Sequence, residues 1–141
     1  MPEESGLNVS IPSSAAALFF ATLPTGQTEE RVFVLPLSGD GKVLAKPVLV
    51  SVGHGKDSAA VEAGEIFREA LKAGAEEIIV AHNHPSGNLA PSKADVAATA
   101  KLHEAAKLLD VPLLDHLILG RKPDGSPDFV SLAEAGMQMM E

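Results

Sequence analysis

Apolar runs of strand length alternate with helical patterns along this chain, and this alternation limits the folds that it can adopt. Two of the runs, "RVFVLPL" at 31–37 and "EIIVA" at 77–81, are rich in β-branched and large apolar residues, which is typical of buried strands. Between them, from residue 63 to 71, apolar residues recur at the spacing of one helix face. Helices interleaved with strands predict an α/β fold, in which helices pack against a mixed sheet.

The remaining patterns complete the order α-β-β-α-β-α-β-β-α. The 141 residues are enough for one domain with one core, which we place at 13–141 after a flexible segment at 1–12. Strands are predicted at 31–37, 43–52, 77–81, 113–120 and 129–131. Helices are predicted at 15–23, capped by Ser13 or Ser14, from Asp57 or Ser58 to a C-terminal Gly74, and at 92–109. A helix or an irregular tail is predicted after residue 131.

Composition excludes several classes of function. The formal net charge is −8, and the 11 Lys and Arg residues are spread without a cluster, so nucleic acid is not an expected partner. The chain contains no Cys, which excludes disulfides and the Cys-ligated zinc site of nucleobase deaminases. No apolar run approaches the roughly 18 residues of a membrane span. Since the acidic start also lacks a secretory signal, we expect a cytoplasmic location.

The segment "AHNHPSGNLAPSKAD" at 81–95 gathers side chains that bind metals. His82 and His84 follow a predicted strand, and residues two apart in a strand point to the same face, so the two imidazoles are expected to converge. Asp95 lies in the first turn of the next helix, which the connection can bring back beside the strand end. Two imidazoles and one carboxylate leave a fourth position open on tetrahedral zinc.

The same segment also has a purely structural interpretation. Ser92 and Asp95 have the spacing of a capping box, in which Ser is the N-cap and an acidic side chain lies at N3. The letters "NHPSG" have the composition of an ordinary turn. From the residues alone, the metal site and the capped turn are equally supported. They are not exclusive, because a serine hydroxyl can accept a backbone N–H and still donate its own hydrogen.

Three stretches of the chain, "HNHPSG", "PSKAD" and "LLDHLILG", closely resemble the RadC family of bacterial proteins. That family is part of the JAMM (MPN-type) group of metalloprotease-like domains. The group's motif is an upstream Glu, then His-x-His, seven residues, Ser, two residues and Asp, and the match here is full. The similarity extends over about residues 13–134.

The resemblance implies an α/β/α sandwich with a mixed sheet, the cytidine-deaminase-like JAMM/MPN fold. It also implies one zinc ion per chain, held by His82, His84 and Asp95. A 2-His-1-carboxylate set also suits Fe(II), but the serine and the glutamate of the motif favour zinc hydrolysis.

The resemblance further implies the catalytic groups. Ser92 is expected to stabilise an oxyanion, and a glutamate is expected to act as general base on the attacking water. Glu30, at the head of the strand at 31–37, is the best match for that glutamate, and Glu29 is its close competitor.

The function expected on this basis is hydrolysis of an amide bond in a peptide or protein substrate. The alternatives are a non-catalytic, metal-binding interaction module and a DNA-repair factor, as the family name suggests. Full-length RadC proteins usually carry an N-terminal helix-hairpin-helix region, for which there is no room before residue 13. The oligomeric state and the substrate stay open.

Three further histidines lie outside the motif. His116, in an apolar strand, is expected to be a buried histidine satisfied by hydrogen bonds, and a role near the metal stays open. Strand alternation places Asp115 on the other face, which makes a direct pair of the two side chains an unfavoured arrangement. His103 is predicted on the helix surface, and His54 in a glycine-flanked loop.

Overall fold

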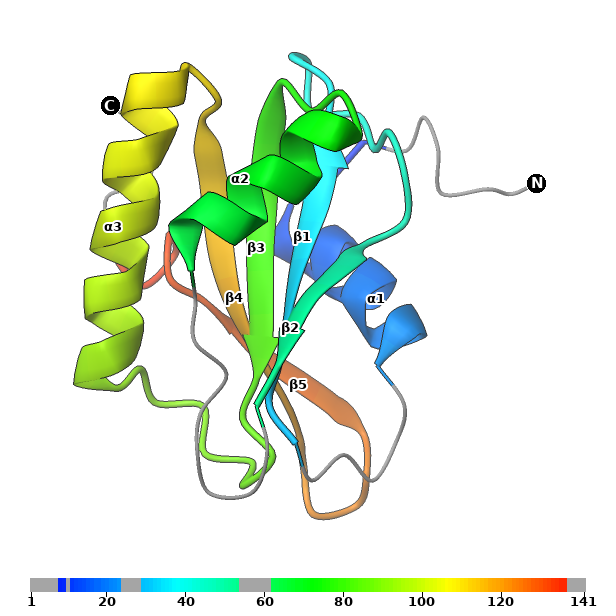
Figure 1. Cartoon of the computed structure of the whole chain (residues 1–141). Helices are drawn as coiled ribbons and strands as arrows, with labels where there is room; N and C mark the ends of the chain where they lie inside the picture. Colours follow the sequence, from blue (N-terminus) through cyan, green and yellow to red (C-terminus); the bar gives the residue numbers. More distant parts are fainter. Residues whose placement is uncertain (1–7, 10, 24–28, 54–61, 137–141) are drawn as a thin grey trace.

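A five-stranded sheet with helices on both faces forms the described part of the chain (Figure 1). The computed structural model describes residues 8, 9, 11–23, 29–53 and 62–136. Strand order in the sheet is β2-β1-β3-β4-β5. The elements are α1 (Pro12–Thr22), β1 (Arg31–Leu37), β2 (Val48–Val52), α2 (Ala63–Lys72), β3 (Glu77–Asn83), α3 (Lys93–Leu109), β4 (Leu113–Arg121) and β5 (Pro127–Ser131).

The sheet is mixed, as predicted. β3 and β4 are parallel, whereas β1 is antiparallel to both β2 and β3, and β5 is antiparallel to β4. α1 covers one face of the sheet, and α2 and α3 cover the other (Figure 1). The predicted α/β/α sandwich is therefore confirmed.

The two core layers explain why the central strands are apolar without interruption. In β1, Val32 and Val34 pack in the cluster under α2 and α3, whereas Phe33 and Leu35 pack in the cluster against α1. Because both faces of a central strand are covered, every residue of β1 after the first is buried, rather than every second one. Full burial of each such side chain stabilises the fold by about 1.5–3 kcal/mol.

Several predicted strand ends differ from the structure; β5, for example, begins at Pro127 rather than at residue 129, and β4 ends at Arg121 rather than at residue 120. The strand predicted at 43–52 begins only at Val48, because Pro47 has no N–H to donate to the ladder, although Val43 still forms an isolated bridge with Leu37. β3 extends to Asn83, beyond the predicted end at residue 81. Of the two alternatives predicted after residue 131, the described residues 132–136 form turns, as in an irregular tail, and residues 137–141 lie outside the described part.

The helix starts also differ. α1 begins at Pro12 with Ile11 as its N-cap, so neither predicted serine cap is used, and proline fits the first helical position, where its missing N–H is not needed. The described part of α2 begins at Ala63, and residues 57 and 58 lie outside the described residues. Its predicted end is confirmed, since Gly74 follows the helix with φ of 77°.

Two described residues of the segment predicted to be flexible, Asn8 and Val9, contact the connection between β1 and β2. Asn8 forms a bridge with Lys42, and the Val9 N–H donates to the Gly41 carbonyl. The domain boundary at residue 13 stays a prediction. None of the helices in the described ranges is both long enough and apolar enough to cross a membrane.

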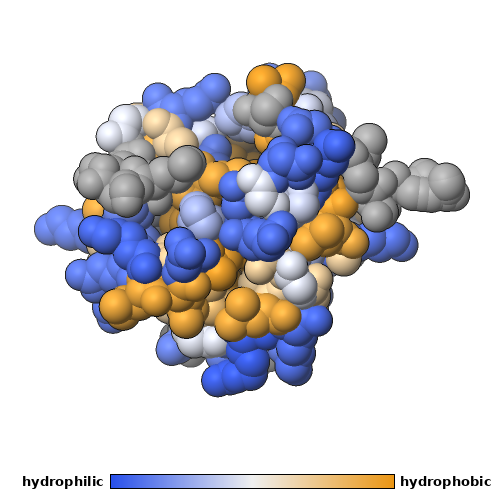
Figure 2. Space-filling view, turned by 90° about the horizontal axis from the view of Figure 1, so that it is seen from above, coloured by the Kyte–Doolittle hydropathy of each residue, from blue (hydrophilic) through white to orange (hydrophobic). Residues whose placement is uncertain are grey.

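Apolar surface lies at the end of the molecule where α2 and α3 finish. Figure 2 views the molecule from this end and shows orange patches among hydrophilic side chains. The exposed large apolar residues near the two helix ends are Leu71, Leu108 and Leu109. β3 starts near this end and runs away from it (Figure 1), so His82 and His84, at the far end of β3, lie at the opposite end of the molecule.

Asp115 anchors the chain that leaves β5. Its Oδ1 accepts the N–H groups of His116 at 2.8 Å and Ala133 at 3.1 Å, and its Oδ2 accepts the Ser131 hydroxyl at 2.6 Å. Burial is the largest influence on this carboxyl and raises its pKa. The folded protein therefore holds the Asp115 proton more tightly than the unfolded chain does.

Asp115→Asn is expected to keep the fold close to wild-type stability, because the amide retains the oxygen that accepts the two N–H groups. Asp115→Ala leaves both N–H groups unpaired and is expected to lower the free energy of unfolding by about 2–4 kcal/mol. Urea unfolding of the three proteins measures this difference. Because the pKa is raised, the wild-type advantage over the Asn variant should shrink as pH rises from 4 to 7. An Asp115→Ala variant as stable as wild type would show that the hydrogen bonds of Asp115 do not stabilise the fold.

Candidate metal centre

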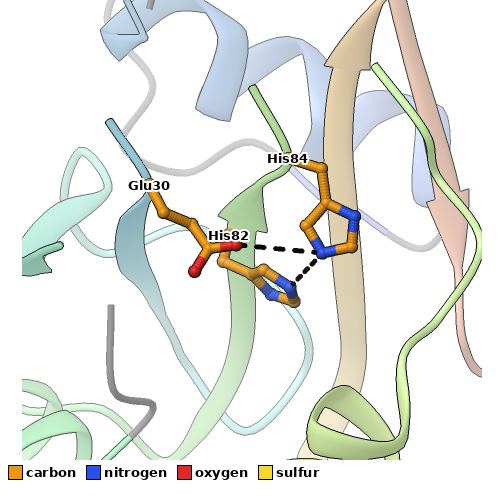
Figure 3. A group of neighbouring side chains, drawn as sticks. All are labelled: Glu30, His82 and His84. Atoms are coloured by element: carbon orange, nitrogen blue, oxygen red, sulfur yellow. Dashed lines mark hydrogen bonds and ion pairs between the residues drawn. The ribbon is translucent and has the colours of Figure 1, made fainter. Parts of the chain in front are cut away.

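The end of β3 brings two histidine side chains together. His82 lies within the strand, His84 directly follows it, and their Nε2 atoms are 3.2 Å apart (Figure 3). β3 reaches past His82 because this residue pairs with Val32 of β1 on one side and Ile118 of β4 on the other. The predicted convergence of the two imidazoles is therefore present.

Asp95 is held beside the histidines by the start of α3. Its Oδ1 lies 2.9 Å from His82 Nε2, and its Oδ2 lies 3.3 Å from His84 Nε2. The carboxylate is also part of a capping box: Ser92 Oγ accepts the Asp95 N–H at 3.0 Å, and Asp95 Oδ2 accepts the Ser92 N–H at 2.8 Å. The capped turn and the convergent ligand set are thus one structure, with the helix cap orienting the carboxylate.

The distances among these three residues fit a tetrahedral ion. Zinc binds imidazole nitrogen and carboxylate oxygen at about 2.0–2.2 Å, which separates neighbouring ligand atoms of a tetrahedron by about 3.3 Å. The three observed separations, 3.2 Å between the nitrogens and 2.9 and 3.3 Å from nitrogen to oxygen, are close to that value. The donor set therefore fits zinc in both chemistry and spacing.

Glu30 reaches the same point from the residue before β1. Glu30, His82 and His84 each offer one ligand atom, and these atoms lie within 4.8 Å of one another, so the three residues form a group able to hold a metal ion (Figure 3). Glu30 Oε2 is 3.9 Å from His84 Nε2, farther than either contact of Asp95. Glu29, its competitor, lies 3.8 Å from Arg31 in an ion pair.

Asn83 fixes the backbone around Glu30 from the other face of the sheet. It stands between the two histidines in sequence, so its side chain points away from them. Its Oδ1 accepts the Arg31 N–H at 2.6 Å, and its Nδ2 donates to the Glu29 carbonyl at 3.0 Å. These bonds hold the peptide groups on both sides of Glu30. Sequence reasoning missed this role, although a buried polar residue between two ligands is a usable signal.

Hydrogen bonds set the charge of the candidate ligand side chains. His84 Nδ1 donates to the Asn88 carbonyl at 2.7 Å, which leaves its Nε2 lone pair facing His82 and Asp95 in the neutral ring. The hydrogen bond to Asp95 is the main cause that raises the pKa of His84. Burial alone would raise the pKa of Asp95, but its bonds to His82, His84 and Ser92 outweigh burial and hold that pKa well below the usual range. The site therefore contains a charged carboxylate.

His116 lies directly behind His82. Its Nε2 is 2.9 Å from His82 Nδ1, and its Nδ1 is 2.7 Å from Thr99 Oγ1. The side chain is fully buried, and burial together with the neighbouring His82 lowers its pKa to about 3, so the ring is neutral. Asp115 contacts the backbone of His116 and not its ring. The expected buried and hydrogen-bonded histidine is confirmed, whereas Thr99 had no signal in the sequence.

Of the remaining two histidines, only His103 lies in the described part of the chain, and it is not among the residues that meet at this centre. His103 lies on α3 and is half-buried rather than on the surface. His54 lies outside the described residues.

The turn that follows β3 packs closely on the end of β4. Gly87 has φ of 85°, and a Cβ there would lie 3.3 Å from the Arg121 carbonyl oxygen. A Cβ on Gly120 would lie only 2.7 Å from a methyl group of Leu89. Glycine is therefore required at position 87, whereas a Cβ at position 120 would displace the Leu89 side chain. This turn carries the chain from His84 to Ser92.

Comparison with known proteins finds a family match over most of the chain. Residues 9–137 match the family described as the RadC-like JAB domain. A UPF0758 protein of Thermosynechococcus vestitus is 43% identical over 123 residues, covering 87% of this chain and 46% of the relative. A UPF0758 protein of Picosynechococcus is 45% identical over 112 residues, covering 79% of this chain and 45% of the relative. The chain thus spans less than half the length of these relatives, and it belongs to the RadC-like JAB domain family.

Proposed function

We propose that this protein is a zinc-dependent hydrolase that cleaves an amide bond in a peptide or protein substrate. The observation that carries the proposal is the convergence of two imidazole nitrogens and one carboxylate at tetrahedral spacing, with a second carboxylate beside them. When bound, zinc polarises a carbonyl as a Lewis acid and lowers the pKa of water at the site to about 7.

In this proposal His82, His84 and Asp95 hold one zinc ion per chain. Asp95 contacts both histidine nitrogens at 3.3 Å or less, whereas Glu30 comes to 3.9 Å from the nearer one. The closer carboxylate is the better third ligand, and the capping box holds it in place. The farther carboxylate is left to accept a proton.

Glu30 is the general base. Its carboxylate takes a proton from the water whose oxygen attacks the carbonyl carbon of the amide. It then delivers that proton to the amine nitrogen as the C–N bond breaks, which balances the hydrolysis. A positioned base of this kind contributes about 10²- to 10⁴-fold to the rate. The two hydrogen bonds of the Asn83 side chain support this role of Glu30, because they fix the backbone from which Glu30 extends.

Ser92 stabilises the carbonyl oxygen as it becomes negative. Its Oγ accepts the Asp95 N–H, and the hydroxyl hydrogen is free of that bond because an accepting oxygen keeps its own proton. Ser92 is exposed to solvent, so a substrate carbonyl can reach its hydroxyl group. Loss of one such donor typically costs about 10²- to 10³-fold in rate.

A peptide-library assay tests the proposal. The zinc-loaded protein is incubated with the library, and mass spectrometry reads new amine and carboxylate ends. Cleavage is expected to stop when a chelator removes zinc and to return when zinc is restored. A natively folded protein that takes up no zinc would overturn the metal site. One zinc per chain without cleavage would instead favour a non-catalytic metal-binding module.

A further inference from the structure

We infer that His116 and Thr99 are positioning residues that set which nitrogen of His82 carries the proton, and thereby make His82 Nε2 available to a metal ion. The inference rests on the proposed zinc site and adds two residues that determine its affinity. Neither residue belongs to the ligand set or to the catalytic groups. They lie on β4 and α3, behind the strand that carries His82.

The first step concerns the two ring nitrogens of His82. Nε2 faces Asp95 and His84, and Nδ1 lies 2.9 Å from His116 Nε2. A neutral imidazole carries one proton, so Nε2 can bind a metal only when the proton is on Nδ1. In that state His82 Nδ1–H donates and His116 Nε2 must accept.

The second step follows the protons away from the metal ligands. If His116 Nε2 accepts, the His116 proton is on Nδ1, and this group donates to Thr99 Oγ1 at 2.7 Å. The Thr99 hydroxyl has a single hydrogen, which it donates to the Asp95 carbonyl at 2.9 Å. All three hydrogen bonds therefore run in one direction, from the ring of one ligand to the backbone of another.

The opposite direction would close the site to metal. If the Thr99 hydroxyl donated to His116 Nδ1, the His116 proton would be on Nε2 and would point at His82 Nδ1. His82 would then carry its proton on Nε2, where the ion must bind. The Asp95 carbonyl favours the open arrangement, because it gives the hydroxyl hydrogen of Thr99 another acceptor.

Burial makes this arrangement stable. Thr99 and His116 are fully buried and His82 is 2% exposed, so solvent does not replace a lost partner. A buried N–H without an acceptor costs free energy. Removal of the Thr99 hydroxyl would leave His116 Nδ1–H in that state, and the protons of both the His116 and His82 rings are therefore expected to shift. Partners of metal-binding histidines typically change metal affinity about 10- to 100-fold when removed.

Thr99→Val removes the hydroxyl at nearly constant volume and is expected to raise the Kd for zinc about 10- to 100-fold. Thr99→Ser restores the hydroxyl and is expected to return the Kd to within about threefold of wild type. Thr22→Val is the matched control, because the Thr22 hydroxyl makes the same kind of helical bond, to the Phe19 carbonyl, on the other face of the sheet. Circular dichroism checks that each variant is folded.

The measurement is a competition for zinc against a fluorescent chelator. Wild type that binds no zinc would overturn the proposed function, and with it this inference. Wild type that binds zinc with the same Kd as folded Thr99→Val would overturn the inference alone. Nitrogen-15 NMR of the histidines in zinc-loaded wild type decides the matter without any variant. A His116 proton on Nδ1 is expected, and a proton on Nε2 would overturn the inference.

Discussion

Asp95→Asn is expected to lose zinc while α3 keeps its cap. The carboxylate beside both histidine nitrogens becomes a neutral amide, whose oxygen is a weak metal ligand. Two imidazoles and such an amide are not expected to retain the ion through purification. The amide oxygen can still accept the Ser92 N–H, so the capping box survives. We expect metal analysis to find about one zinc per chain in wild type and almost none in the variant.

Asp95→Ala and Ser92→Ala separate the metal from the helix cap. The Asp95→Ala protein is expected to lose zinc and also about 1 kcal/mol of stability, because the Ser92 N–H loses its acceptor in the capping box. Ser92→Ala should lose a similar amount of stability but keep its zinc, since the carboxylate remains. If both Asp95 variants kept one zinc per chain, Glu30 would be the third ligand and our assignment of the two carboxylates would be wrong.

Glu30→Gln is expected to lower the rate of amide hydrolysis by about 10²- to 10⁴-fold without loss of zinc. The amide occupies almost the same space as the carboxylate but does not accept a proton. The rate is measured with any peptide that wild type cleaves, and zinc content is measured on the same samples.

Glu29→Gln is the matched control for this prediction, because it makes the same change of charge at the neighbouring residue. It should keep both zinc and activity, since Glu29 forms an ion pair with Arg31. Unchanged hydrolysis by Glu30→Gln would show that another group is the base. Loss of zinc from that variant would show that Glu30 is a ligand.

Much of the fold could be predicted, because its signals are local. Apolar periodicity reveals strands and helices whose side chains are buried on one or both faces, and the order of elements was confirmed except at the tail. Boundaries were less certain because they depend on backbone hydrogen bonds. β3 continues through His82 only because two neighbouring strands pair with that residue, and no pattern within β3 shows this.

The candidate site could likewise be predicted from the sequence only in part. His82, His84 and Asp95 are close in sequence, so their spacing along one strand and one helix turn predicts that they meet. Thr99 and His116 meet only because α3 packs on the face of the sheet to which the side chains of His82, on β3, and His116, on β4, point. The hydrogen bond from the Arg31 N–H to the Asn83 side chain joins residues that are 52 positions apart. Such contacts are products of the tertiary fold.

The two faces of β3 also bear on how such domains diverge. The two histidines of the proposed metal site extend from one face at the end of β3, and Asn83, which holds the backbone of Glu30, extends from the other. If Glu30 is the base, as we propose, a change at Asn83 displaces it while the two histidines stay in place. A single mutation at Asn83 would then abolish catalysis while the metal stays bound, and a single reversion would restore it.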